Sequence, residues 1–199
     1  MEASGLAAGK KNAAWLGAHI VFANESGFML IPTVRRTWAP VGQTPIVRHR
    51  YNHARISVIG GLAISPKRRR LSLYFRLHPK NISHQEVYDF LWYLLKHLRG
   101  PVIVIWDGAS IHTPSPNSDL AALCARYPRL HLKRLPAYAP QLNPIEAAWH
   151  HAKRPLANGG PDNLQQLGVD LLKSLHQLRR SQRNLRGCIS QSELPPFLL

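Results

Sequence analysis

Residues 102–108 read VIVIWDG, and this short stretch decides which fold we expect. Five apolar residues in a row are typical of a central, parallel strand that is buried on both faces. Asp107 follows at the carboxyl end of that strand, where ligand sites gather in open α/β sheets. The stretch therefore predicts an α/β domain with a polar site beside Asp107.

The chain before this strand favours a meander of strands. We expect strands at residues 17–24, 27–31, 55–64 and 71–77, and a Pro- and Gly-rich turn at 39–45 flanked by residues 35–38 and 46–50. The last of these strands alternates Leu71, Leu73, Phe75 and Leu77 on one face, as a half-buried strand does. The adjacent Gly60 and Gly61 indicate a bulge or a close backbone approach.

The chain after the meander alternates helices and strands. Ser83 and Glu86 form a capping box that opens a helix, which Gly100 and Pro101 stop. Further helices are expected near 119–127, from Asn143 onward and at 162–180, with a strand at 130–135. This order predicts a mixed sheet, an antiparallel meander continued by parallel strands, with helices on both faces.

Composition narrows the function. The 199 residues carry 26 Lys and Arg against 10 Asp and Glu, a net charge of +16. This imbalance indicates a polyanionic partner, nucleic acid first, over a merely solvated basic surface. Hydrophobic residues make up 45% of the chain, which excludes a wholly disordered protein. The longest apolar run is too short to cross a bilayer, and Cys124 and Cys188 lie too far apart for a zinc site.

The amino-terminal region offers two interpretations. Lys10 and Lys11 precede an apolar stretch, residues 13–23, that could act as a secretory signal. Glu2 in the basic region and His19 in the apolar region argue against a signal. We therefore expect a buried strand and a cytoplasmic protein.

Elimination among the ten acids leaves three for chemistry, namely Glu25, Asp107 and Glu146. Glu146 lies in the first turn of a helix that follows a rigid, Pro-rich loop. Successive strand residues face opposite sides, so only one of Asn24 and Glu25 can share a face with Asp107. Converging carboxylates in a basic protein suggest Mg²⁺ and phosphate chemistry. The alternative is structural, with Asp107 capping a loop and Glu146 pairing with a Lys or Arg.

Four motifs resemble one family. They are FANESGF at 22–28, RRTWAPVGQTP at 35–45, WDGASIH at 106–112 and LPAYAPQLNPIE at 135–146. These look like the catalytic half of a mariner-superfamily insertion-sequence transposase, of the bacterial six-thirty group. The resemblance implies an RNase H-like fold with a five-stranded sheet and an Asp-Asp-Glu triad. It covers residues 17–185, which leaves 1–16 as a flexible lead-in and 186–199 as a tail.

The triad carries over with one change. Asp107 matches the second acid and Glu146 the third, but Asn24 stands where the family has the first Asp. Glu25 matches a neighbouring Glu that is not a metal ligand. The resemblance implies two Mg²⁺ or Mn²⁺ ions held by Asn24, Asp107 and Glu146. Asn24 removes one negative charge, so we expect weak metal binding and poor DNA cleavage. The alternatives are an inactive or repurposed DNA-binding remnant, and a nuclease acting on RNA–DNA hybrids.

The resemblance also implies partners. Family members bind element ends and target DNA, form a dimer, and carry a helix-turn-helix module, for which sixteen lead-in residues are too few. This chain is then a fragment, or the module is encoded separately. His112 could contact phosphate or hold its own loop, and Trp106 and Trp149 are expected to be buried. Trp38 could stack on a base, but burial at a hairpin is the favoured interpretation. Tyr138 could line the DNA channel, but we expect it to brace its loop. The expected DNA contacts are Arg35, Arg36, Lys67, Arg68, Arg69, Arg70, His112, Lys133, Arg134, Arg179 and Arg180.

Overall fold

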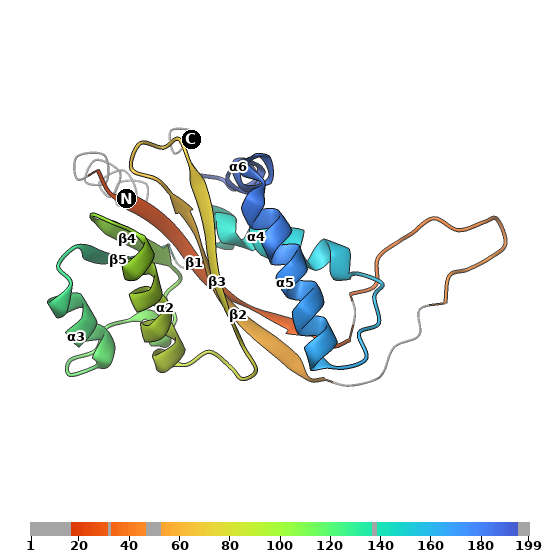
Figure 1. The fold of residues 1–199 in the computed structure, drawn as a ribbon, viewed down its shortest axis with the longest axis horizontal. Helices are drawn as coiled ribbons and strands as arrows, with labels where there is room; N and C mark the ends of the chain where they lie inside the picture. Colours follow the sequence, from red (N-terminus) through yellow and green to blue (C-terminus); the bar gives the residue numbers. More distant parts are fainter. Residues whose placement is uncertain (1–16, 32, 47–52, 137–138, 195–199) are drawn as a thin grey trace.

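The protein, seen in a computed structural model, contains one mixed five-stranded sheet (Figure 1). The structure describes residues 17–31, 33–46, 53–136 and 139–194. The strand order is β3-β2-β1-β4-β5, antiparallel among the first three and parallel among the last three. The mixed sheet with helices on both faces confirms the predicted fold class. The strands are β1 (His19–Met29), β2 (Arg55–Ile64), β3 (Leu71–His78), β4 (Val102–Trp106) and β5 (Leu130–Arg134).

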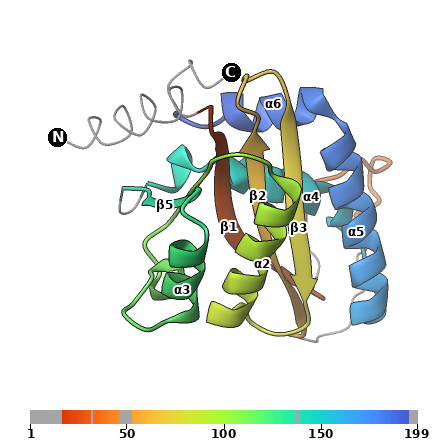
Figure 2. The ribbon, with the colours of Figure 1, turned by 60° about the vertical axis from the view of Figure 1, so that its left-hand side comes forward.

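Helices cover both faces of the sheet. The two helices on one face are α2 (His84–His97) and α3 (Asp119–Arg126), which lie together in front of the sheet in Figure 2. The other face carries α4 (Pro144–Lys153), α5 (Leu164–Arg180) and α6 (Gln182–Ser190). Three short 3-10 turns complete the description, η1 (Ser110–His112), η2 (Pro140–Leu142) and η3 (Arg154–Leu156). The capping box at Ser83 is present as predicted.

Strand alternation divides the core in two. Ile20 and Phe22 of β1 pack against α4, α5 and α6, whereas Val21 and Ala23 pack against α2 and α3. Because side chains alternate along a strand, the next two residues of β1 leave the sheet on opposite faces. Asn24 therefore faces α4 and Glu25 faces α2, before any interaction between their side chains is considered.

The first strand differs from the sequence expectation. Residues 17–24 and 27–31 were expected as two strands, but β1 is one strand of 11 residues. Its neighbour β2 pairs with it continuously, from Ile20 opposite Ile64 to Met29 opposite Arg55. This pairing carries the backbone past Ser26 and Gly27 without a break, since a long partner strand overrides weak local strand propensity.

Gly60 and Gly61 mark a close approach, the second of the two predicted alternatives. The β2–β3 pairing runs through both residues without a bulge. A Cβ atom on Gly60 would overlap the Trp149 ring of α4 and lie 3.1 Å from the Tyr74 carbonyl oxygen, while one on Gly61 would lie 2.6 Å from Val21 Cγ1. The missing Cβ at Gly60 therefore lets the Trp149 indole of α4 pack closely against β2.

The ends of the domain also differ from expectation. The predicted boundary at residue 185 falls inside α6, whose Leu185, Cys188 and Ile189 are buried in the α4-side core, and Leu194 beyond the helix is buried too. Residues 186–194 of the proposed tail are therefore part of the packed domain because they supply core residues. The proposed lead-in, residues 1–16, lies outside the described residues.

The Pro- and Gly-rich segment between β1 and β2 forms no strand over residues 33–46, and residues 47–52 lie outside the described part. Figure 1 shows the described residues reaching away from the sheet. Trp38 is 99% exposed, so the expectation that it is buried was wrong. Trp106 and Trp149 are buried as predicted. No helix in the described ranges is both long and apolar enough to span a membrane.

Candidate active site

The candidate site forms where β1 and β4 run side by side. Phe22 lies opposite Ile105 in the last parallel pair of these strands. Asn24 and Asp107 each lie two residues beyond that pair, so they emerge at the same level of the sheet. The carboxyl ends of parallel strands are where loops leave a sheet and ligands bind. Asp107 thus lies at the edge of the sheet where it was predicted, and Asn24 lies beside it at the same level.

On the α4 face, an amide meets a carboxylate. Asn24 donates a short hydrogen bond from Nδ2 to Glu146 Oε1. Asn143, which precedes α4, donates from Nδ2 to the carbonyl oxygen of Ala23 at 3.1 Å. Asn143 occupies the N-cap position of α4, where Asn is a favoured residue, but it makes no side-chain cap bond, because its buried side chain ties α4 to β1 instead. This bond sets the first turn of α4, which carries Glu146, beside Asn24.

Glu146 has a mixed environment. Its side chain keeps an exposed edge, yet surrounding protein atoms remove part of its hydration. This desolvation raises the pKa of the carboxyl above its ordinary value, and the negative charge of Asp107 acts in the same direction. The hydrogen bond from Asn24 and the charge of Lys153 oppose the rise. Because Asp107 influences this pKa, the two predicted carboxylates lie in one electrostatic environment.

On the α2 face, a histidine joins two carboxylates. His112 Nε2 lies 2.9 Å from Glu25 Oε1, and His112 Nδ1 lies 2.7 Å from Asp107 Oδ1. The turn η1 carries His112 and folds back so that the imidazole ring lies on the α2 face of the sheet. Asp107 Oδ1 also accepts a hydrogen bond from the backbone N–H of Ala109 at 3.0 Å. We call Glu25, His112 and Asp107 the histidine bridge.

The bridge is rigid and buried at its centre. His112 is 2% exposed and stacks on Trp106 with ring centroids 4.2 Å apart and an interplanar angle of 13°. Burial alone would lower the pKa of His112, but the hydrogen bonds and charges of Glu25 and Asp107 outweigh it, so the pKa rises above its ordinary value. A protonated ring donates from both nitrogens, which matches the two carboxylate oxygens that face it. Both ring nitrogens are thereby occupied, so His112 holds its own loop and does not fit the predicted contact with phosphate.

Glu25 is the residue that sequence reasoning placed outside the site. Strand alternation does turn it to the face opposite Asn24, as expected. It nevertheless connects to Asp107 through His112, which lies 87 positions later in the chain. A half-buried carboxylate is stabilised by a partner, and the histidine five residues after Asp107 was the available signal.

The residues present only partly fit the two metal ions that the family resemblance implies. Mg²⁺ is held by one or two carboxylates with substrate phosphate completing its shell, and Asp107 and Glu146 provide two. Asn24 instead directs an N–H group at a Glu146 oxygen, where a carboxylate would have added charge. Among the residues described, no three His, Cys, Asp or Glu side chains form a cluster able to hold a metal. Asp107 and Glu146 therefore offer two carboxylates to a hard cation, and Asn24 adds no negative charge to them.

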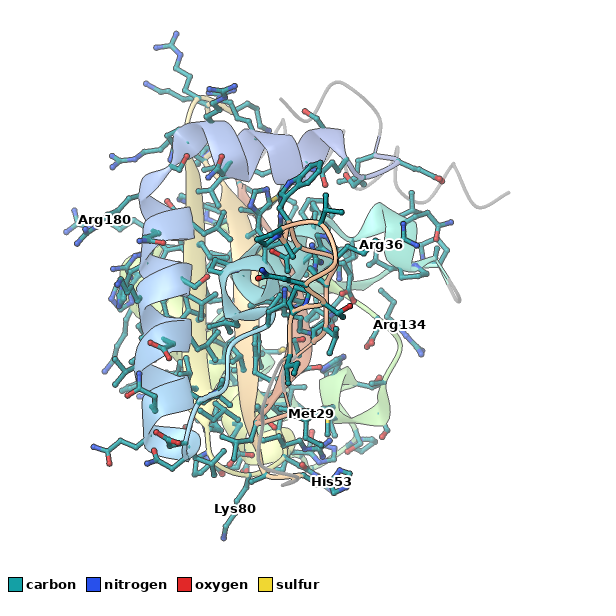
Figure 3. All side chains as sticks on the ribbon, turned by 90° about the vertical axis from the view of Figure 1, so that its right-hand side faces the viewer. Met29, Arg36, His53, Lys80, Arg134 and Arg180 are labelled. Atoms are coloured by element: carbon teal, nitrogen blue, oxygen red, sulfur yellow. The ribbon has the colours of Figure 1, made fainter. Side chains whose placement is uncertain are left out.

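The predicted DNA contacts fall on different parts of the surface. Arg35 lies at the site, with Nη2 3.2 Å from His150 Nε2, one turn after Glu146 on α4. Arg134 donates to the carbonyl oxygen of Gly108 at 2.8 Å, beside Asp107, and Lys133 is exposed next to it. Figure 3 shows Arg36 and Arg134 on one flank and Arg180 on the opposite flank. Of the remaining predicted contacts, Arg69, Arg70 and Arg179 line one groove together with Arg180, whereas Arg68 donates to the carbonyl oxygen of Ala18 and Lys67 is exposed in the turn before it. Tyr138 is outside the described residues.

Comparison with known proteins agrees with this geometry. A family model described as DDE superfamily endonuclease matches residues 19–167. The Mos1 transposase paired-end complex with left transposon end is similar with a TM-score of 0.56 and 15% identity, over 94% of this chain and 59% of that chain. A pre-cleavage Mos1 transpososome is similar with a TM-score of 0.54 and 16% identity, over 96% of this chain and 60% of that one.

The Mos1 paired-end complex with Mg gives a TM-score of 0.53 at 16% identity, over 96% of this chain and 60% of that chain. This chain thus spans about three-fifths of the solved chains it matches. No curated protein matches the chain significantly. At these identities the likeness concerns the fold, which is RNase H-like.

Proposed function

Because this chain belongs to the DDE superfamily of endonucleases, we propose that it is the catalytic domain of a DNA transposase whose metal site is weakened at position 24. The observation that carries the proposal is the hydrogen bond from the Asn24 amide to Glu146. It supports a triad in which residue 24 lies beside the third acid, and it supports a weakened site, because an amide cannot supply negative charge.

The charge distribution supports DNA as the substrate. The net charge of +16 suits a polyanion, and Arg35 and Arg134 border the acids. Asp107 and Glu146, with Oδ1 of Asn24, would hold a divalent cation. Such ions activate a nucleophile and stabilise a leaving oxygen in phosphodiester chemistry. The chain's own contribution is orientation, since the histidine bridge fixes Asp107 and the Asn143 bond fixes the start of α4.

Asn24 itself favours a second candidate, a DNA-binding protein that retains the fold but does not cut. With one charge fewer at position 24 in the middle of β1, cation binding weakens while the basic surface remains. The two functions can be distinguished by measuring DNA cleavage, because a negative charge at position 24 should restore cleavage only if the chain is a transposase.

The deciding experiment compares the chain with its Asn24→Asp variant on duplex DNA in Mg²⁺ and in Mn²⁺. A unit charge about 4 Å from another charge is worth about 4 kcal/mol at an effective dielectric constant of 20. We therefore expect cleavage to rise by on the order of a hundredfold or more, and Mn²⁺ binding, measured by paramagnetic resonance, to tighten in parallel.

Two controls make the result interpretable. Adding Asp107→Asn to the Asn24→Asp variant should abolish the gained cleavage, which excludes a contaminating nuclease. Tighter Mn²⁺ binding and cleavage in the single variant support the transposase proposal. Unchanged Mn²⁺ binding and no cleavage, with DNA binding retained, support the non-cutting protein.

The proposal extends to partners and place. We infer a homodimer that holds two DNA ends, end recognition by a helix-turn-helix part outside this chain, and action in the bacterial cytoplasm at the nucleoid. Size-exclusion chromatography with light scattering, with and without duplex DNA, tests the dimer, and a strictly 1:1 complex of chain and duplex would contradict it.

A further inference from the structure

Two segments of the chain contain no acidic residue at all. They are residues 65–78 and 171–192, and neither includes an Asp or a Glu. Between them they carry Lys67, Arg68, Arg69, Arg70, Arg76, Lys173, Arg179, Arg180, Arg183 and Arg186.

The fold joins the two segments along the free edge of the sheet. The side-chain amide of Gln182 accepts from the Leu71 N–H at 3.0 Å and donates to the Leu71 carbonyl oxygen at 2.8 Å. Arg186 donates to the carbonyl oxygen of Arg69 at 2.9 Å. Figure 2 shows α5 running alongside β3, with α6 crossing near the start of that strand. One continuous surface results, to which β3, α5 and α6 all contribute.

A groove of about 850 Å³ follows this edge. Its lining includes Arg69, Arg70, Arg179 and Arg180, with Tyr74 and Tyr93 from the α2 side. The four arginines are exposed. We call this lining the edge groove. Tyrosine hydroxyls and planar guanidinium groups are donors that suit phosphate oxygens.

Among the residues that the structure describes, no ion pair neutralises the positive charges of the edge groove. The ion pairs found among the described residues all involve His112, far from the groove. Arginines this close together repel one another, and a polyanion relieves that repulsion. Packing uses some of the neighbouring cations, since Arg68 donates to the Ala18 carbonyl oxygen, but Arg70 and Arg180 have no such role.

The edge groove is separate from the candidate active site. Leu71 pairs with Ile64, which pairs with Ile20, near the start of β1, whereas Asn24 and Glu25 lie further along the same strand. β3 is the edge strand and β1 is the centre of the sheet. In Figure 3 Arg180 points away from one flank, and Arg134, next to the site, lies on the other. A straight duplex held at Asp107 therefore does not run along this groove.

We propose that the edge groove binds the phosphate backbone of a second segment of duplex DNA, distinct from the segment at the acidic site. The inference rests on the proposed function in that DNA is the substrate, and adds a second contact for the same chain. A membrane surface is the less favoured partner, because the large exposed apolar side chains lie outside the groove lining. Backbone contacts of this kind position DNA without reading its sequence.

The test uses the full chain and a 40-base-pair duplex of arbitrary sequence, with fluorescence anisotropy over a range of KCl concentrations. The groove variant combines Arg70→Gln, Arg179→Gln and Arg180→Gln. The matched control combines Lys80→Gln, Arg99→Gln and Arg126→Gln, three exposed cations outside the groove that remove the same charge. If each groove arginine contacts one phosphate, the slope of log K against log salt falls by about 2.7, and affinity at moderate salt drops about tenfold or more.

The outcomes separate the interpretations. A smaller salt slope in the groove variant alone, with circular dichroism unchanged, supports the edge groove. Equal losses in both variants would show a bulk charge effect and overturn it. Normal DNA binding by the groove variant, with lost sedimentation on phosphatidylserine vesicles, would reassign the groove to membranes. This experiment measures DNA binding without metal. The edge-groove proposal can therefore fail while the Asn24→Asp cleavage test succeeds, and the reverse is also true.

Discussion

The two sides of the candidate site are built by neighbouring residues of one strand, yet their charges are balanced differently. On the α4 side, Asn24 presents a neutral amide to a single carboxylate, Glu146. On the α2 side, His112 lies between two carboxylates and stacks on a buried ring. On the α2 side, the two carboxylates thus share a histidine that can carry a positive charge. On the α4 side, position 24 carries no charge. A change at position 24 can therefore disable chemistry without loosening the fold around it.

His112→Ala should have the largest effect on stability, because it removes the central residue of the histidine bridge. The variant loses a buried ring, its stacking on Trp106 and both carboxylate contacts. We expect a loss of about 2–4 kcal/mol in the free energy of unfolding, measured by urea denaturation. The solvent exposure of Asp107, whose side chain is 56% exposed, keeps the loss below that of a fully buried ion pair.

The control for this variant is His150→Ala. His150 is exposed, and within the described part of the chain its side-chain hydrogen bond is to Arg35, so its loss should change stability by less than about 0.5 kcal/mol. Equal destabilisation by the two variants would show that the histidine bridge contributes little to the fold, and the contrast between the two sides would be lost.

Gly60→Ala tests whether the packing of α4 on the sheet holds the α4 side of the site in place. Gly60 pairs with Asn24 across the sheet, and its missing Cβ leaves the space that Trp149 of α4 fills. An added methyl must displace the indole, and with it the helix that carries Glu146. Overpacking of this kind costs about 1–3 kcal/mol. Thermal denaturation measures the loss.

Gly168→Ala is the matched control. A Cβ at Gly168, within α5, would lie 3.5 Å from Ile56 Cδ1, an ordinary contact. Alanine in a helix interior is favoured over glycine by roughly 0.5–1 kcal/mol, so this variant should be neutral or stabilising. A neutral Gly60→Ala would mean that the Trp149 contact does not fix α4.

Local patterns predicted the parts of the site that depend on local sequence. The apolar run of β4 identified Asp107, and the helix that begins after Asn143 placed Glu146 in its first turn. Contacts between distant segments were not predictable. Asn143 looked like a cap, but it bonds to Ala23, 120 residues earlier, and Glu25 finds His112 only because η1 folds back under β1. Such contacts have no periodicity that one sequence can reveal.

The same limit explains the errors in the fold. The break expected between residues 24 and 27 follows local propensity, whereas β2 supplies a partner along the whole of β1. The helix α6 is short and polar in most positions, and its burial depends on α4 being underneath it. Trp38 shows the reverse case, an apolar residue whose type predicts burial while its segment leads away from the core.

Glu25→Gln should produce the smallest effect on stability and the most specific one. It removes one negative charge from the histidine bridge and keeps the shape of the side chain. The ordinary pKa of histidine is 6.5, and that of His112 is raised in the folded protein. A raised pKa means that the protonated ring contributes stability fully below pH 6.5, and that this contribution is lost as the pH rises through the folded-state pKa.

Without the charge of Glu25, the pKa of His112 moves back toward its ordinary value. The difference in free energy of unfolding between the original chain and Glu25→Gln should therefore be greatest near pH 6, about 1 kcal/mol, and should shrink toward pH 9. Urea denaturation at several pH values measures it, and Glu193→Gln, an equal loss of charge away from His112, should show no such trend. A difference that grows with pH would mean that His112 is neutral in the fold, and that both sides of the site lack a charge.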